Sequence, residues 1–176
     1  MISIITAVSQ NDIIGKKGPE PLLWRIPEEL ALFKKVTNGS VIVMGRNTML
    51  TLREPLPNRT NVVLSRTLAA GKTDKGFLVF NSIADIVRDY PSFFVIGGEE
   101  IYRQFIEIAD QVIMTTLGIT IEAEEPQAFA VFPVDKLEAQ YYLAYESKVM
   151  IDRDKISDQD VEYIVTRWFR EISKLH

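Results

Sequence analysis

The stretch from Trp24 to Thr37 places an acidic residue where the surrounding pattern predicts burial. Pro27 suits the first turn of a helix, because its fixed φ is already helical and its missing N–H has no intrahelical partner there. At about 100° per residue, the apolar side chains form one arc, and Glu29 projects between Val36 and Phe33 within that arc. A carboxylate facing an apolar surface must be paired, protonated or used. The alternative is that Glu29 leans out to water as a partner of the helix dipole.

Three predicted strands end in small or glycine residues that are followed by a helix or a basic residue. Gly97-Gly98 precedes a predicted helix and offers backbone N–H groups to an anion, although a tight turn explains the pair equally well. Arg46 and Arg66 each follow a strand, and ligands bind at the carboxyl ends of strands in open parallel sheets. Two arginines beside a glycine pair indicate a dinucleotide that carries an additional phosphate. The Gly-x-Gly-x-x-Gly fingerprint is absent, so this is not the usual Rossmann site.

The composition excludes several kinds of chemistry. The chain has no cysteine, and its single histidine is the last residue, His176. We therefore expect no metal site, no thiol nucleophile and no Ser-His-Asp triad, and acid–base work falls to carboxylates, lysines, tyrosines or water. The net charge of −4 argues against a nucleic-acid or membrane-surface partner. Without a long apolar run or a signal-peptide pattern, we expect a soluble, cytoplasmic protein.

The segment from Ile14 to Leu23 reads as a lid. It contains two glycines and two prolines, which exclude a helix or a central strand from most of it. A flexible segment beside a site is suited to close over bound ligands and to exclude water. Trp24 at its end should report the closure.

Apolar runs and turn signals predict the elements that position these residues. The predicted strands are Ile2 to Val8, Val41 to Met44, Thr60 to Leu64, Phe77 to Phe80, Phe93 to Ile96, Val112 to Ile121, Ala139 to Met150 and Val161 to Phe169. Predicted helices begin at Pro27, after Gly45, at Ile83 with Ser82 as the N-cap, and at Glu99, the last extending to about Ile108 with Ile101, Phe105 and Ile108 buried. Ala69 to Lys75 is predicted as a polar loop, and Glu122 to Gln127 as an exposed acidic segment. The order indicates one α/β domain over residues 1–176, with a mostly parallel sheet and an antiparallel C-terminal edge.

Several motifs together resemble those of the dihydrofolate reductase family, in the right order over nearly the whole chain. They are Trp24-x4-Glu29-x3-Phe33-x3-Thr37, Ile13-Ile14-Gly15, Met44-Gly45-Arg46-x-Thr48, Pro55-Leu56-Pro57-x-Arg59-x-Asn61, Leu64-Ser65-Arg66, Ile96-Gly97-Gly98-x-x-x-Tyr102 and Phe132-Pro133. The resemblance implies a sheet of about eight strands with helices on both faces, and a cis peptide between Gly97 and Gly98. It also implies NADPH-dependent reduction of 7,8-dihydrofolate to tetrahydrofolate, which supplies one-carbon metabolism and thymidylate synthesis.

The resemblance implies roles for individual residues. Glu29 and Trp24 would be catalytic, and Ile5, Glu29, Leu30, Phe33 and Thr115 would enclose the pteridine. Thr115 would support Glu29 by hydrogen bonding, and Arg59 would bind a carboxylate of the glutamate tail. The NADPH site would be lined by Ala7, Ile14, Gly15, Gly45, Arg46, Asn47, Thr48, Leu64, Ser65, Arg66, Ile96, Gly97, Gly98, Glu99, Ile101 and Tyr102. We further expect a monomer that binds antifolate inhibitors.

The chain departs from the family pattern at a few positions. Leu23 stands where proline is usual before the tryptophan, Met49 where tryptophan is frequent, and the loop between Gly15 and Trp24 is about two residues longer than the common spacing. Two other hypotheses stay open. One is the related NADPH-dependent pyrimidine reductase of riboflavin synthesis, against which Glu29 argues. The other is a non-catalytic dinucleotide-binding module.

Overall fold

The computed structural model describes residues 1–122 and 124–172, so His176 lies outside the described part of the chain. The strands are β1 (Ile2–Val8), β2 (Ile13–Lys16), β3 (Val41–Gly45), β4 (Thr60–Leu64), β5 (Gly71–Lys72), β6 (Leu78–Phe80), β7 (Phe93–Gly97), β8 (Gln111–Leu117), β9 (Phe129–Val131), β10 (Tyr141–Glu146), β11 (Met150–Arg153) and β12 (Asp160–Arg170). The helices are α1 (Pro27–Thr37), α2 (Arg46–Thr51), α3 (Ile83–Asp89), α4 (Glu99–Phe105) and α5 (Val134–Gln140), with a short 3-10 turn at Pro126–Ala128.

Ten of these strands form one twisted sheet within the described residues, and β2 and β9 form a separate two-stranded sheet. The order of the large sheet is β10-β12-β8-β1-β7-β3-β4-β6-β5, with β11 also paired to β12. The central strands from β8 to β6 run parallel, whereas β12 joins β8 antiparallel and carries β10 and β11. The predicted α/β class is therefore confirmed. The strand count exceeds eight because the C-terminal edge is divided in two and β5 adds an antiparallel edge strand.

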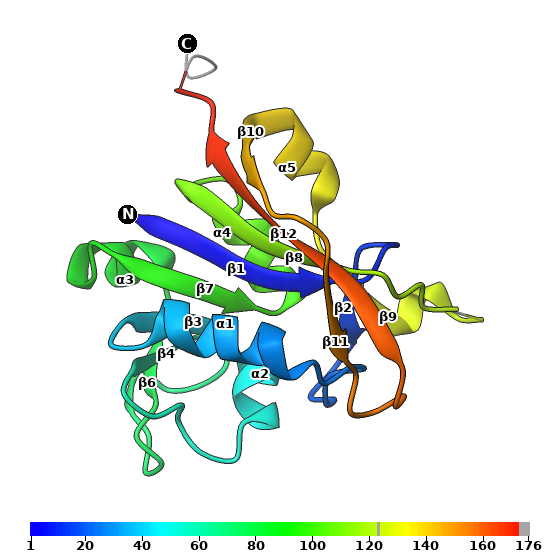
Figure 1. The fold of residues 1–176 in the computed structure, drawn as a ribbon. Helices are drawn as coiled ribbons and strands as arrows, with labels where there is room; N and C mark the ends of the chain where they lie inside the picture. The colour runs from blue at the N-terminus through cyan, green and yellow to red at the C-terminus, as the bar shows by residue number, and fades with distance from the viewer. Residues whose placement is uncertain (123, 173–176) are drawn as a thin grey trace.

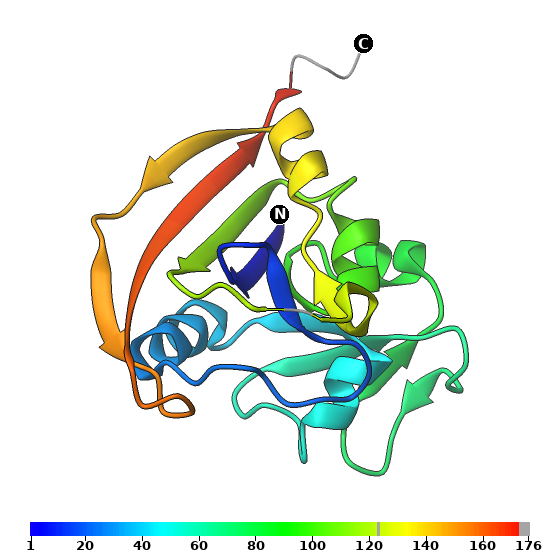
Figure 2. The same cartoon turned by 90° about the vertical axis from the view of Figure 1, so that its right-hand side faces the viewer.

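Helices cover both faces of the sheet, as Figures 1 and 2 show. Alternate residues of β1 point to opposite faces, so Ile4 and Ile5 enter different cores. Ile4 packs in the core with residues of α3, α4 and α5. Ile5 packs in the core that receives the apolar side of α1. β1 lies in the middle of the sheet, with one core on each of its faces. Its carboxyl end therefore lies next to both cores and to the lid segment.

The start of α1 agrees with the sequence prediction. Pro27 occupies its first turn, and Glu29 is buried although Lys34 and Lys35 on the same helix are exposed. The Ser82 hydroxyl accepts a hydrogen bond from the Asp85 N–H, which confirms the predicted N-cap of α3. These features depend on short-range spacing, which the sequence displays directly.

The end of α4 differs from the prediction. The helix ends at Phe105 and not near Ile108. Ile106 is fully buried, whereas Ile108 is 42% exposed. The helical periodicity that predicted burial of Ile108 stops with the helix, because the chain turns towards β8 and presents Ile106 to the core instead.

The predicted long strand from Ala139 to Met150 is also wrong. Residues up to Gln140 form α5, and the remainder is divided between β10 and β11 with a break at 147–149. Leu143 and Tyr145 are about half exposed, so the alternation of this edge strand does not mark a covered face. The predicted loop from Ala69 to Lys75 likewise contains β5, which pairs with β6.

In the described residues no helix has the length and apolar character needed to cross a membrane.

Arg170 at the end of β12 closes the structure around the C-terminal end of α4. Its guanidinium donates to the carbonyl oxygens of Ala109 and Ile106, to the Gln140 side chain and to the Tyr141 hydroxyl. The same group lies 4.7 Å from the centre of the Tyr141 ring. Arg170 and the Tyr141 hydroxyl, which also donates to the Ile106 and Ala109 carbonyl oxygens, together satisfy carbonyl groups at and just beyond the end of the helix.

We predict that Arg170→Ala lowers the free energy of unfolding by roughly 3 kcal/mol, because it removes four hydrogen bonds to partly buried acceptors, and the Tyr141 hydroxyl can donate to only one of the two carbonyl oxygens. Urea denaturation is the measurement. Arg167→Ala is the matched control, since Arg167 lies on the same strand with its side chain exposed. Equal stability of the two variants would contradict the assignment.

Candidate active site

A cavity of about 1100 Å³ lies at the carboxyl ends of β1, β3, β4 and β7. These strands are neighbours in the sheet, so their final residues meet along one edge, where α1, α2, α4 and the lid segment complete the wall. This is the position at which open α/β sheets bind their ligands. Within the described residues no group of three or more His, Cys, Asp and Glu side chains is arranged to hold a metal ion.

The cavity brings together nearly all the residues predicted for the site. Every residue predicted for the cofactor lines it, together with Trp24 and the substrate candidates Ile5, Glu29, Leu30, Phe33 and Arg59. Thr115 is the exception. It is buried and pairs in register with Ala7 on the neighbouring strand, but it does not line the cavity, and within the described residues it makes no hydrogen bond with Glu29. The roles of all these residues remain proposals.

Glu29 is the buried acid of the site. Its side chain is 9% exposed, and burial raises the pKa of its carboxyl to about 7. Among the described residues no hydrogen bond or ion pair reaches this carboxylate. The group is therefore poised between its charged and neutral forms near neutral pH, and its acceptor atoms are available to a ligand.

Trp24 is buried beside this end of the cavity, with 2% of its surface exposed. Its indole Nε1–H is the one buried side-chain polar atom without a hydrogen-bond partner in the described part of the chain. An unpaired buried donor costs about 1–3 kcal/mol. This cost indicates that an acceptor from outside the protein belongs at the site.

Arg59 is held at the rim next to Phe33. Its Nε–H donates to the Pro57 carbonyl oxygen at 2.9 Å, its Nη1 donates to the Thr37 hydroxyl at 3.1 Å, and its Cζ lies 6.0 Å from the centre of the Phe33 ring. Partial burial lowers the pKa of its guanidinium. No carboxylate of the described residues pairs with it, so its remaining donors suit an external carboxylate.

The opposite end of the cavity is basic. Arg46 on α2 and Arg66 after β4 line it, are exposed, and have no acidic partner within the described residues. The Ser65 hydroxyl accepts from the N–H groups of Thr67 and Leu68, while the Asn81 amide donates to the carbonyl oxygens of Ser65 and Leu68. These bonds keep the loop after β4, which carries Arg66, in place, while α2 carries Arg46 at the same end of the cavity.

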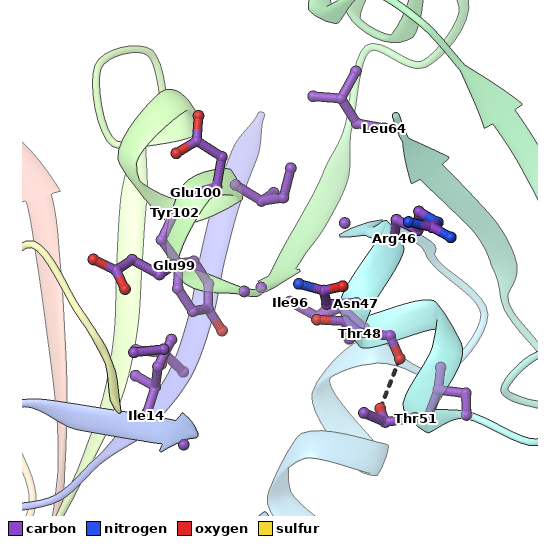
Figure 3. Close-up of a pocket in the computed structure, with 18 of the residues that line it drawn as sticks. Ile14, Arg46, Asn47, Thr48, Thr51, Leu64, Ile96, Glu99, Glu100 and Tyr102 are labelled. Carbon is purple, nitrogen blue, oxygen red and sulfur yellow. Dashed lines mark hydrogen bonds between the residues drawn. The ribbon is translucent and has the colours of Figure 1, made fainter. Parts of the chain in front are cut away.

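Glycines allow close approach between the two sides. A Cβ on Gly45 would come within 2.8 Å of Ile101 Cγ1, and one on Gly97 would lie 3.1 Å from the Tyr102 hydroxyl. The peptide between Gly97 and Gly98 is cis, as the family resemblance predicted. Figure 3 shows Tyr102 and Glu99 from α4 on one side of the cavity and Thr48 with Arg46 from α2 on the other.

Tyr102 is buried in this wall. Its hydroxyl donates to the Ile5 carbonyl oxygen at 3.0 Å, and burial raises the pKa of that hydroxyl. The phenol therefore stays neutral and fixes α4 against β1.

The lid begins in a strand. Ile13 and Gly15 of β2 pair with β9, and the Lys17 N–H donates to the Ala128 carbonyl oxygen at 2.9 Å. The Glu99 carboxylate accepts from the Val131 N–H at 3.2 Å. The lid is thus attached to α4 through β9, a segment that sequence patterns left unassigned.

Sequence reasoning missed several lining residues. Thr6, Thr67, Asn81 and Ser82 contribute polar atoms to the wall. Asn81 and Ser82 follow β6, a further parallel strand of the same sheet. The rule that ligands lie at the ends of parallel strands, applied to this strand as well, would have found them.

The fold and the cavity define a class of protein. It is an α/β protein with a basic end suited to a phosphorylated dinucleotide and an apolar end that contains one buried acid. Comparison with known proteins narrows this class. The family model for dihydrofolate reductase matches residues 1–167, and the chain belongs to the dihydrofolate reductase family.

Relatives agree with this assignment. A dihydrofolate reductase of Haemophilus influenzae is 35% identical over 122 residues, covering 69% of this chain and 75% of that protein. One of Bacillus subtilis is 38% identical over 127 residues, covering 70% and 73%. A structure of dihydrofolate reductase from Enterococcus faecalis, complexed with NADP(H) and RAB-propyl, has a TM-score of 0.80 at 24% identity, and the match covers 97% of this chain and 96% of that one.

We predict that Glu29→Gln changes how stability depends on pH in the ligand-free protein. The pKa of Glu29 is raised from 4.5 to about 7, so between these values the folded state holds a proton that the unfolded state releases. The stability of the wild type therefore falls as pH rises through this window. Between about pH 5 and about pH 8, the wild type should lose about 2 kcal/mol more than the variant. Urea denaturation at both values measures this difference, and parallel losses would contradict it.

Proposed function

We propose that this chain is an NADPH-dependent oxidoreductase that reduces 7,8-dihydrofolate to 5,6,7,8-tetrahydrofolate, with Glu29 binding the pterin ring. The observation that carries the proposal is one cavity with chemically different ends. At one end a buried carboxylate with free acceptor atoms lies among apolar side chains. At the other end two arginines have no acidic partner among the residues that the structure describes. A pterin offers paired N–H donors to the first, and a phosphorylated adenosine suits the second.

The residues present fit NADPH. Arg46, Ser65, Arg66 and Asn81 would hold the phosphate on the adenosine, since neither arginine has an acidic partner among the described residues and hydrogen bonds hold the loop that carries Arg66. A Cβ on Gly45 or Gly97 would press on Ile101 or Tyr102 of α4, so glycine at these two positions lets the strand ends pack closely against α4. The cofactor supplies the hydride when it is bound.

The protein orients the substrate and controls its protonation. Glu29 can accept hydrogen bonds from the pterin amino group and the ring N–H, which orients the ring for reduction at C6. Reduction at C6 proceeds readily only if the neighbouring N5 gains a proton. We assign the immediate delivery of that proton to water, because the carboxylate occupied by the amino group is too far from N5. The free Trp24 N–H provides a place for such a water or for a polar atom of the substrate.

Arg59 and the lid complete the assignment. The unpaired donors of Arg59 would bind a carboxylate of the glutamate tail, and Leu30 and Phe33 would contact the apolar part of the substrate. Closure of the lid over the site would exclude water from the reacting atoms. The same pocket would accept antifolate inhibitors, since they present comparable donors to Glu29.

The two alternative hypotheses have no specific observation in their favour. The relatives described above are dihydrofolate reductases, and neither a pyrimidine reductase nor a non-catalytic dinucleotide-binding module accounts for the buried Glu29. We further propose that the protein acts as a cytoplasmic monomer without a nucleic-acid partner. Sedimentation at assay concentration tests the oligomeric state.

We predict a preference for NADPH over NADH that depends on Arg46 and Arg66. Replacing both with alanine should remove most of the preference, because the additional phosphate loses its charge-assisted donors. The measurement is the ratio of kcat/KM for the two cofactors. Arg53→Ala is the control, since Arg53 is exposed and does not line the cavity. A wild type that used both cofactors equally would contradict the prediction.

We predict that Glu29→Gln lowers turnover near neutral pH on the order of 100-fold, because the charge that binds the pterin donors is lost. Activity of the wild type should fall as pH rises, since the supply of protons fails. The variant should recover part of its rate at lower pH, where the substrate itself gains the proton. Single-turnover hydride transfer across pH separates these effects. Profiles of the same height and shape would show that Glu29 is only structural.

A further inference from the structure

The first turn of α1 is capped by a residue from a distant part of the chain. The residue before the helix is Ile26, which has no side-chain acceptor, and Pro27 follows it. The N–H of Glu28 instead donates to the Asp152 carboxylate of β11 at 2.9 Å. A carboxylate at this position both satisfies a free donor and interacts favourably with the helix dipole.

The residue between Trp24 and Ile26 is bound by the same hairpin. The Arg25 N–H donates to the Asp154 carboxylate at 2.8 Å, and the Arg25 carbonyl oxygen accepts from the Lys155 N–H at 2.8 Å. The N–H and the carbonyl oxygen of Arg25 are therefore both hydrogen-bonded to the turn between β11 and β12. Figure 2 shows α1 lying against this orange hairpin.

Asp154 is unusually buried for an acid, with 2% of its surface exposed. Besides Arg25, it accepts from the N–H groups of Ile156 and Ser157 and from the Ser157 hydroxyl. Burial alone would raise the pKa of this carboxyl, but the donors from Arg25, Ile156 and Ser157 outweigh it and hold the pKa below its usual value. The neighbouring Arg153 pairs with Asp158 and Asp160. The acceptor atoms of Asp154 are thus used to hold backbone.

We propose that Asp152 and Asp154 are positioning residues that fix Glu29 and Trp24 for catalysis, an inference that rests on the proposed function. Arg25 and Glu28 lie directly before and after Ile26 and Pro27. Because the backbone is held at both residues, the direction in which α1 begins is fixed. The position of Glu29, one residue further along, is fixed as well. It also fixes the end of the lid at Trp24.

The lid is consequently anchored at both ends by different segments. At its start Lys17 is bonded to Ala128, and at its end Arg25 is bonded to Asp154. Within residues 18–24 of the described chain, no backbone–backbone hydrogen bond joins the lid to the rest of the protein. Movement of the lid is therefore confined to these residues, and Asp154 keeps the movement from reaching Glu29.

The experiment compares Asp152→Ala and Asp154→Ala with the conservative Asp152→Asn and Asp154→Asn, which keep an acceptor oxygen. Asp158→Asn is the matched control, because Asp158 lies in the same hairpin with its side chain exposed and, of the described residues, its carboxylate pairs with Arg153. Amide hydrogen exchange at Arg25 and Glu28 in the ligand-free protein gives a readout independent of activity. Trp24 fluorescence is followed in a Trp168→Phe background, since the chain has two tryptophans.

The alanine variants should exchange at least about 10-fold faster at Arg25 (Asp154→Ala) and at Glu28 (Asp152→Ala), since protection there comes from these bonds. Hydride transfer should slow about 10-fold, because small misplacements of catalytic groups are costly. KM for NADPH should change less than about 2-fold, since Arg46 and Arg66 lie at the other end of the cavity. The asparagine variants should recover most of both losses, and Asp158→Asn should match the wild type.

Two results would overturn the proposal. One is unchanged exchange and unchanged hydride transfer in the alanine variants. The other is a parallel loss of hydride transfer and NADPH affinity that asparagine does not rescue, which would show general loosening of the fold. If Asp154→Ala does not fold, the half-exposed Asp152 carries the test alone. If the wild type fails to reduce dihydrofolate, the proposed function fails, while the exchange measurements still decide whether the hairpin fixes the helix.

Discussion

Burial of one carboxylate in an otherwise apolar wall is the constraint on which the structure around the cavity depends. Glu29 is buried with no hydrogen-bond or ion-pair partner among the described residues, and burial alone raises the pKa of its carboxyl. Such a group costs folding free energy that the rest of the protein must offset. The compensation expected for an active site is a ligand that supplies the missing donors. Function and instability therefore have the same physical origin at this residue.

Glu29 stays buried only if the helix that carries it cannot turn the carboxylate out to water. Local sequence contributes Pro27 and the apolar residues of α1. The remaining restraint comes from β11 and its turn, whose carboxylates hold backbone N–H groups of Arg25 and Glu28. A similar arrangement occurs at the other wall, where the Tyr102 hydroxyl fixes α4 to β1 and Arg170 binds the carbonyl groups at the far end of that helix. Each wall is held by segments from distant parts of the chain.

Most elements that form the cavity could be predicted because their signals are local. Buried parallel strands are short apolar runs, and the strand ends Gly45, Leu64 and Gly97 are followed within two residues by a helix or a basic residue. The predictions failed where packing against other parts of the chain decides the secondary structure or the burial of a residue. Residues 139–150 have a strand-like composition, but the first of them complete α5 and the others lie on an exposed edge, where apolar residues remain in water. The predicted burial of Ile108 is wrong for the same kind of reason, since α4 ends before this residue.

The sequence by itself indicated the α/β class, the position of the proposed nucleotide-binding residues at strand ends, and an acid within the apolar arc of α1, since these follow from the order of the elements and from spacing along them. The tertiary structure alone decided which distant groups meet. It placed Asn81 against the loop that carries Arg66, left Thr115 outside the cavity wall, attached β2 to β9, and brought Asp152 and Asp154 to the start of α1. These contacts join residues as many as 129 positions apart. They depend on the order and register of the strands, which no local pattern encodes.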